Sequence, residues 1–82
     1  MPARIISEDE RAIYERAIYE HIRTAYAEYL SVMETKKFLG LKDLRSARDW
    51  LEDVPRTHIG KRDKWSAREI ARKLWRNMEV MA

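Results

Sequence analysis

The sequence predicts a mainly α-helical fold that carries one short β-hairpin and begins with a long helix. The pattern Ser-x-x-Glu occurs at 7–10, 31–34 and 66–69. Each is a potential capping box, in which the serine hydroxyl accepts from the N3 amide and the glutamate accepts from the cap amide. Only two Gly and two Pro occur in 82 residues, which favours long regular elements. The hairpin is indicated by the polar stretch RTHIGKRDKWS at 56–66.

Length and composition predict a single domain over residues 1–82, with an N-terminal helix at 7–28 and a second module at 31–78. The chain is 45% hydrophobic and 38% charged, as expected of a compact helical protein. It contains no run of about 18 apolar residues and no apolar segment of the signal-peptide kind at its N-terminus. We therefore expect no membrane association and a cytoplasmic location.

The residue types that carry most enzyme chemistry are missing or badly spaced. The chain has no cysteine, and its two histidines, His21 and His58, stand 37 positions apart. No Gly-rich phosphate loop or nucleophile motif occurs either. We expect no metal site, no cofactor and no enzymatic activity.

Positive charge is concentrated in the second half of the chain. Residues 1–40 hold six Lys/Arg and seven Asp/Glu, whereas residues 41–82 hold eleven and seven. Within residues 56–76 eight cations face two anions. This density predicts attraction to a polyanion such as nucleic acid.

The first helix, about residues 8–28, contains the repeat ERAIYERAIYE. Five residues advance about 140° net around a helix, so the apolar side chains cover a broad arc. We expect an inward stripe of Tyr14, Ala17, Ile18, His21, Ile22, Ala25 and Tyr29. Ile13, Tyr19 and Tyr26 would lie at its margins, where they either widen the core face or mediate self-association.

Two helices follow, joined by a glycine turn. The first, about 32–39, ends at Gly40 in the C′ position, and Asp43 is a good N-cap for the second. In the second helix, about 44–54, apolar residues recur at helical spacing before Pro55: Leu44, Ala47, Trp50, Leu51 and Val54. Residues 32–54 therefore have the form of a helix-turn-helix.

After Pro55 the sequence predicts a strand at 56–59, a turn at 60–63 and a return strand at 64–65, with Ile59 and Trp65 holding the hairpin to the core. A last helix is predicted at about 67–78, and its inward face would consist of Ile70, Ala71, Leu74, Trp75 and Met78. The tryptophans follow apolar rhythms, which favours a place in the core over base stacking. Together these elements predict a winged helix-turn-helix with a two-stranded β wing and an added long N-terminal helix.

From Tyr29 to Trp75 the chain resembles the MerR-like winged-helix modules of excisionases and related phage or plasmid regulators. The resemblance lies in YLSVMETKKFLGLKD, RSARDWLED, VPRTHIGKRDKW and SAREIARKL. In that family a capped helix ending in Leu-Gly precedes a recognition helix, a Pro-containing link, a basic Ile-Gly wing and a supporting helix. The resemblance implies that this chain binds DNA. The long N-terminal helix is an addition to this pattern.

Candidate DNA contacts fall on the predicted recognition helix and wing. The outward residues of the helix are Lys42, Arg45, Ser46, Arg48 and Asp49. An arginine here can bond guanine O6 and N7 together, although Asp49 could instead pair with Arg45 within the helix. The wing candidates are Arg56, Thr57, His58, Lys61, Arg62 and Lys64, which would meet phosphates or a minor groove, or else form a solvated loop.

Lys36 and Lys37 are secondary candidates for phosphate contacts.

Two functions stay open at this point. The first is sequence-specific binding of double-stranded DNA, as an excisionase or a transcriptional regulator of a phage or mobile element. The second is a phage-type interaction module or inhibitor, which would bind a host protein or a recombinase through the N-terminal helix. That helix could also form a homodimer.

Overall fold

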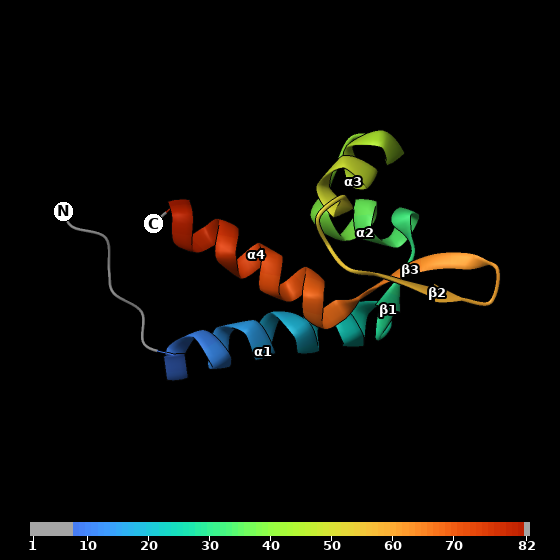
Figure 1. Ribbon diagram of the computed structural model, residues 1–82. Coiled ribbons are helices and arrows are strands. Elements are labelled where there is room, and N and C mark those ends of the chain that lie inside the picture. The colour runs from blue at the N-terminus through green and yellow to red at the C-terminus, as the bar shows by residue number, and fades with distance from the viewer. Residues whose placement is uncertain (1–7, 82) are drawn as a thin grey trace.

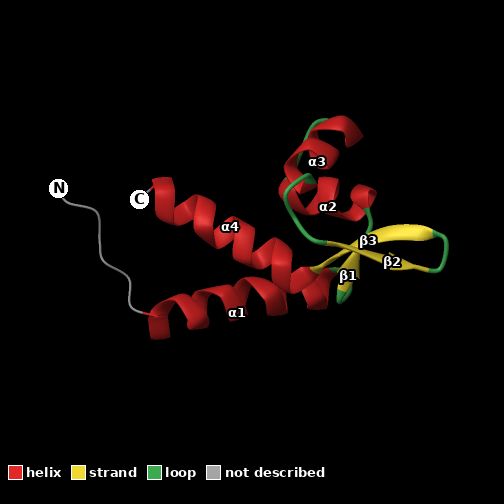
Figure 2. Ribbon diagram, in the orientation of Figure 1, coloured by secondary structure: helices red, strands yellow, loops and turns green. Residues whose placement is uncertain are grey.

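The computed structural model describes residues 8–81 and the side-chain surroundings of residues 10–77. Within this range the fold is mainly helical with a small antiparallel sheet, which confirms the predicted class (Figures 1 and 2). The elements in order are α1 (Glu8–Ala25), β1 (Tyr29–Leu30), α2 (Val32–Leu39), α3 (Leu44–Leu51), β2 (Arg56–Ile59), β3 (Arg62–Ser66) and α4 (Ala67–Met81).

The first helix and the last lie side by side and run in opposite directions (Figure 1). Helix α1 ends at Ala25, earlier than predicted, because the chain turns there to enter the sheet. The first potential capping box cannot be assessed, since Ser7 lies outside the described residues. At α4 the predicted box is wrong: the Ser66 hydroxyl accepts from the amide of Arg68 at 3.1 Å, and the Glu69 carboxylate pairs with Arg72 instead.

Strand β1 is an element that the sequence analysis did not predict. It pairs with β3, Tyr29 opposite Ser66 and Leu30 opposite Trp65, so the sheet has the order β1-β3-β2. The amide of Ala67 extends this pairing with a 2.8 Å hydrogen bond to the carbonyl of Glu28. Leu30 is fully buried, so its side chain anchors the sheet in the core.

Helices α2 and α3 have the predicted caps. Ser31 and Glu34 form a complete capping box, with bonds of 3.2 Å and 3.0 Å. Gly40 adopts a left-handed conformation with φ 69°, and the amide of Leu41 reaches back to the carbonyl of Lys36. A residue with a Cβ would be strained at this φ, so glycine is what lets the chain reverse between the helices.

The start of α3 is also as predicted, but its end is not. Asp43 accepts a 2.8 Å hydrogen bond from the amide of Ser46. The helix ends at Leu51 rather than Val54, and residues 52–54 form a turn in which the amide of Val54 bonds the carbonyl of Leu51. Val54 is nevertheless buried as expected. Pro55 lacks an amide hydrogen, and the backbone has already left the helix before it.

The hairpin is longer and its turn tighter than predicted. Ile59 is opposite Arg62, so only Gly60 and Lys61 form the turn. Gly60 has φ 65° and no other described residue of the turn has a positive φ, as in a type II′ hairpin turn. Trp65 is buried as predicted, but Ile59 is 43% exposed and does not hold the hairpin to the core. The reason is position, since β2 is an edge strand and Ile59 lies at its distal end.

One apolar core has buried members on the sheet and on α1, α3 and α4, and Val32 and Phe38 of α2 pack against it. Its buried members are Tyr19, Ile22, Leu30, Leu51, Val54, Trp65, Ala67, Ile70 and Ala71. Of the inward residues predicted for α4, Trp75 is also buried and stacks on Tyr14, with ring centroids 5.0 Å apart.

The predicted inward stripe of α1 is right for Ile22, which is fully buried, and for Ile18, which packs against the core, but it is wrong for four other residues. Ala17, His21, Ala25 and Tyr29 are exposed, whereas Tyr19 belongs to the core. The repeat spreads apolar residues evenly and does not specify which side of α1 is buried. Packing against α4 selects the side that contains Tyr19, and Arg68 of α4 lies over the Tyr19 ring at 4.6 Å. The Tyr19 hydroxyl also donates to the Glu28 carboxylate beside the first strand.

Candidate nucleic-acid interface

The outer face of α3 presents the predicted charged residues to solvent. Arg45, Arg48 and Asp49 are exposed, while Ala47 and Leu51 on the opposite face are buried. Arg45 and Arg48 lie three residues apart and therefore on one side of the helix. Within the described residues no ion pair joins Arg45 to Asp49, so the guanidinium is not held by this carboxylate.

The other two predicted residues of this face lie at the start of the helix. Lys42 is exposed in the turn before α3, and Ser46, whose amide donates to the capping Asp43 carboxylate, is half-buried. That hydrogen bond holds the pKa of Asp43 below its ordinary value. The Asp43 carboxylate therefore stays ionised and fixes the first turn from which Lys42 and Arg45 project.

The β2–β3 hairpin carries a cross-strand charge cluster. His58 is opposite Asp63, and its Nδ1 lies 3.0 Å from the Asp63 carboxylate. Arg56 Nη1 lies 3.4 Å from the other oxygen of the same carboxylate. The hydrogen bond from His58, and then the charge of Arg56, hold the pKa of Asp63 below its ordinary value. Asp63 thus organises two of the predicted wing residues.

The remaining hairpin cations lie at and beside the turn. Lys61 and Arg62 are exposed at the tip, and within the described residues neither forms an ion pair with a carboxylate. Lys64 is half-buried opposite the exposed Thr57. The tip is therefore the part of the hairpin whose positive charge is available to a ligand.

An open groove of about 1130 Å³ separates α3 from the hairpin. Arg48, Asp49 and Glu52 line it on the helix side, and Arg56, Arg62 and Asp63 line it on the hairpin side. Its floor is made by Val32, Leu51, Val54 and Trp65. The structure therefore brings residues from both predicted contact sets to one concave surface.

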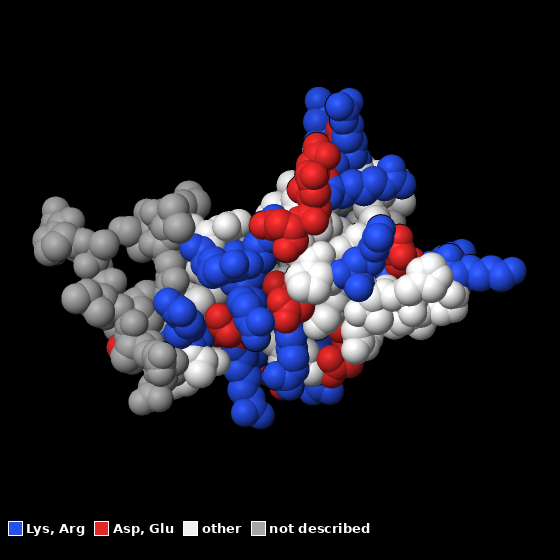
Figure 3. Space-filling view, viewed as in Figure 1, with Lys and Arg blue, Asp and Glu red and all other residues white. Residues whose placement is uncertain are grey.

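Charge on this end of the molecule is not uniform. Figure 3 shows blue cationic side chains at the α2–α3 end and at the hairpin tip, with red acidic ones between them. Of the secondary candidates, Lys37 is exposed and Lys36 half-buried in the last turn of α2. A polyanion would meet two separate groups of cations here rather than one continuous patch.

The three residues predicted for self-association are not brought together. Ile13 is 67% exposed, but Tyr19 is in the core and Tyr26 is half-buried, with its ring edge-on to Phe38. Tyr19 cannot reach a second chain without leaving the core. Any association through α1 would therefore rest on Ile13 and its exposed neighbours.

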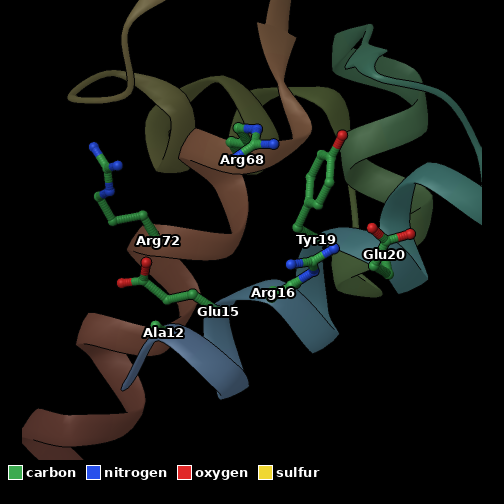
Figure 4. Close-up of a pocket in the computed structure, with 7 residues that line it drawn as sticks. All are labelled: Ala12, Glu15, Arg16, Tyr19, Glu20, Arg68 and Arg72. Carbon is green, nitrogen blue, oxygen red and sulfur yellow. The ribbon is translucent and has the colours of Figure 1, made fainter. Parts of the chain in front are cut away.

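Two features were missed by the sequence analysis. Lys73 of α4 contacts Trp50 and Asp53 at and just after the end of α3, although these residues lie 23 and 20 positions away in the sequence. Arg16, Arg68 and Arg72 line a second groove, between α1 and α4 (Figure 4). The four-residue spacing of Arg68 and Arg72 was a signal for a shared face. Nothing in the sequence placed Arg16 beside them.

Comparisons with known proteins find no matching family model, no similar curated protein and no similar solved structure. Among the described residues no helix is long and apolar enough to cross a membrane. The same part of the chain contains no group of three or more His, Asp or Glu side chains placed to hold a metal ion.

Proposed function

We propose that this protein binds double-stranded DNA as a winged helix-turn-helix module, in which α3 is the recognition helix and the β2–β3 hairpin is the wing. The observation that carries the proposal is the groove that Arg48 of α3 shares with Arg56 and Arg62 of the hairpin. A helix with its outer face free can enter a major groove while neighbouring cations meet the phosphates.

The parts of this module have distinct tasks. Arg45 and Arg48 would read base edges, because a guanidinium can bond guanine O6 and N7 at once. Lys61 and Arg62 would contact phosphates or the adjacent minor groove. Lys37 at the end of α2 would set the register on the backbone.

The biological role we propose follows the resemblance to excisionases and related regulators. Such a protein does no chemistry itself. It would arrange the DNA of a recombinase, or regulate transcription, in a phage or mobile element. No cofactor is needed for either role.

A second candidate is binding to a protein partner through α1, and the exposed Ile13 favours it. The partner would be a second copy of the chain, a recombinase or a host protein. This candidate predicts that a substitution of Ile13 weakens binding of the protein partner, whereas substitutions of the hairpin cations leave that binding unchanged.

The test of DNA binding is a salt titration by fluorescence anisotropy with a short random-sequence duplex. The variant Lys61→Gln with Arg62→Gln loses two positive charges at the wing. If both contact phosphates, the slope of log K against log salt should fall by about 1.8, so that the affinity lost between 50 and 200 mM salt is about 12-fold smaller.

A matched control separates this local effect from net charge. Ala17→Glu with Thr24→Glu changes the net charge equally, at two exposed positions of α1. The control should keep the parental slope to within about half a unit. Equal slopes for the parent and the wing variant would refute the proposed wing contact.

A further inference from the structure

A groove of about 330 Å³ between α1 and α4 holds three arginines that the proposed recognition helix and wing do not use. Figure 4 shows Arg16 on the α1 wall, and Arg68 and Arg72 on the α4 wall. The rest of the lining is Ala12, Glu15, Tyr19 and Glu20. The arginines come from opposite ends of the sequence and meet only because α1 and α4 pack together.

Much of this positive charge is not compensated by ion pairs. Within the described residues no carboxylate forms an ion pair with Arg16 or Arg68. Arg68 lies over the Tyr19 ring, a contact that orients the guanidinium without neutralising it. The carboxylate of Glu20 on the groove wall is already bonded to Arg23 at 2.8 Å.

The pKa of Glu20 also reflects the positive charge of the groove. Its pKa is held below the ordinary value first by the hydrogen bond from Arg23, and further by the charges of Arg16 and Arg68. The two groove arginines therefore lie close enough for their fields to reach the same carboxylate. Arg72 adds a third charge, shared with Glu69 at 3.1 Å.

The chemistry of this surface favours a nucleic acid over a protein. A guanidinium presents a planar fork of donors that matches phosphate oxygens in pairs. Protein interfaces have an apolar core with few charged residues, whereas nucleic-acid interfaces are more polar and much more positive. Here the apolar lining is one alanine and the edge of Tyr19, which is only 8% exposed.

We propose that the α1–α4 arginine groove is a second phosphate-binding surface, occupied by a further segment of duplex DNA. The α1–α4 pair extends away from α3 and the hairpin (Figure 1). A protein 46 Å long that contacts DNA at both places can hold two DNA segments together. The identity of the ligand rests on the proposed function, but the groove itself does not depend on α3 or the hairpin.

The experiment measures whether the full chain bridges two duplexes. One random-sequence duplex is immobilised on beads, and capture of a second, fluorescent duplex is followed as protein is added. Anisotropy with a single duplex gives the salt slope in parallel. The variants are Arg68→Gln with Arg72→Gln, the charge-retaining Arg68→Lys with Arg72→Lys, and the wing variant Lys61→Gln with Arg62→Gln.

The expected result is capture by the parent and about a tenfold or greater loss with the Gln groove variant, whose salt slope also falls by about 1.8. The Lys variant should keep the parental salt slope, because the charge is kept, and should lose less capture than the Gln variant. Circular dichroism melting should show that both groove variants are folded, since the two side chains are exposed.

Three outcomes would overturn the inference. The first is parental capture and slope in the Gln groove variant. The second comes from a further variant, Ile13→Lys: if it loses capture while the groove variant does not, a dimer bridges the DNA. The third is binding of polyglutamate, but not of a second duplex, that depends on Arg68 and Arg72. Loss of all DNA binding in the groove variant alone would support the groove and refute the proposed recognition surface.

Discussion

Lys73 fastens the end of α3 to α4, and its removal should loosen the position of the proposed recognition helix. Its side chain is only 14% exposed. The ammonium group donates to the carbonyl of Trp50, lies 2.6 Å from the Asp53 carboxylate and 4.3 Å from the centre of the Trp50 ring. Three interactions of one group therefore converge where α3 ends.

The informative substitution is Lys73→Met, which keeps most of the aliphatic stem and removes the charge. A hydrogen bond from a charged donor contributes about 1.5–3 kcal/mol. The pair with Asp53 is exposed on the carboxylate side, so solvent screening leaves it only a small further contribution. The free energy of unfolding should fall by about 1.5–3 kcal/mol, which lowers the Tm of a domain of this size by about 10 °C or somewhat more.

The pH dependence supplies a second check on the same contact. The hydrogen bond from Lys73 holds the pKa of Asp53 below its ordinary value of 3.8. A lowered folded-state pKa stabilises the fold above the unfolded value, and this contribution is lost as pH falls through the folded value. The stability gap between the parent and Lys73→Met should therefore narrow in acid below that ordinary value.

Urea unfolding followed by circular dichroism, from neutral pH down to about pH 3, measures both effects. The control is Lys42→Met, which removes the same charge from an exposed side chain in the turn before α3. Its cost should stay within about 0.5 kcal/mol. An equal loss in the two variants, or a gap that does not change with pH, would refute the reasoning.

Three further predictions concern binding and association. Arg45→Ala and Arg48→Ala should reduce the preference for a specific site over random duplex by about 1–3 kcal/mol where a guanine contact is lost, and footprinting competition would show it; equal losses on both DNAs would make these residues phosphate contacts. Asp63→Asn should tighten binding to random duplex at low salt, because it removes a carboxylate from the groove and releases Arg56; anisotropy showing weaker or unchanged affinity would contradict this. Ile13→Lys should abolish any concentration-dependent association of the parent in sedimentation, and a parent that is monomeric at high micromolar concentration would exclude the dimer.

The local parts of the fold could be predicted from sequence because each depends on a few neighbouring residues. The Ser31 capping box, the left-handed Gly40 and the Asp43 cap are all set by side chain to backbone bonds within one turn. The basic hairpin was visible for the same reason, since Gly60 marks the turn. Only the exact register of β2 against β3 could not be predicted, because it depends on how the two strands pair.

The parts that failed depend on packing between distant segments. A two-residue strand such as β1 carries too little sequence to be recognised, and it exists because β3 offers it an edge. The face of α1 could not be chosen from a repeat that spreads apolar residues over a broad arc. Tyr19 is inside because α4 covers it, and the arginine groove follows from the same contact.

The arrangement of opposite charges around the proposed recognition surface bears on specificity rather than on affinity. Asp49, Glu52 and Asp63 line the groove between α3 and the hairpin together with Arg48, Arg56 and Arg62, so the lining has no net excess of positive charge to attract phosphates. In the proposed complex, a duplex with α3 in its major groove would have its phosphates near the exposed Arg45 on one side and Lys61 on the other. A duplex displaced along the surface brings phosphates against the carboxylates, and like charges in contact are costly. If the protein binds DNA as proposed, the acidic residues would disfavour such displaced positions, which would let a surface of modest net charge be selective.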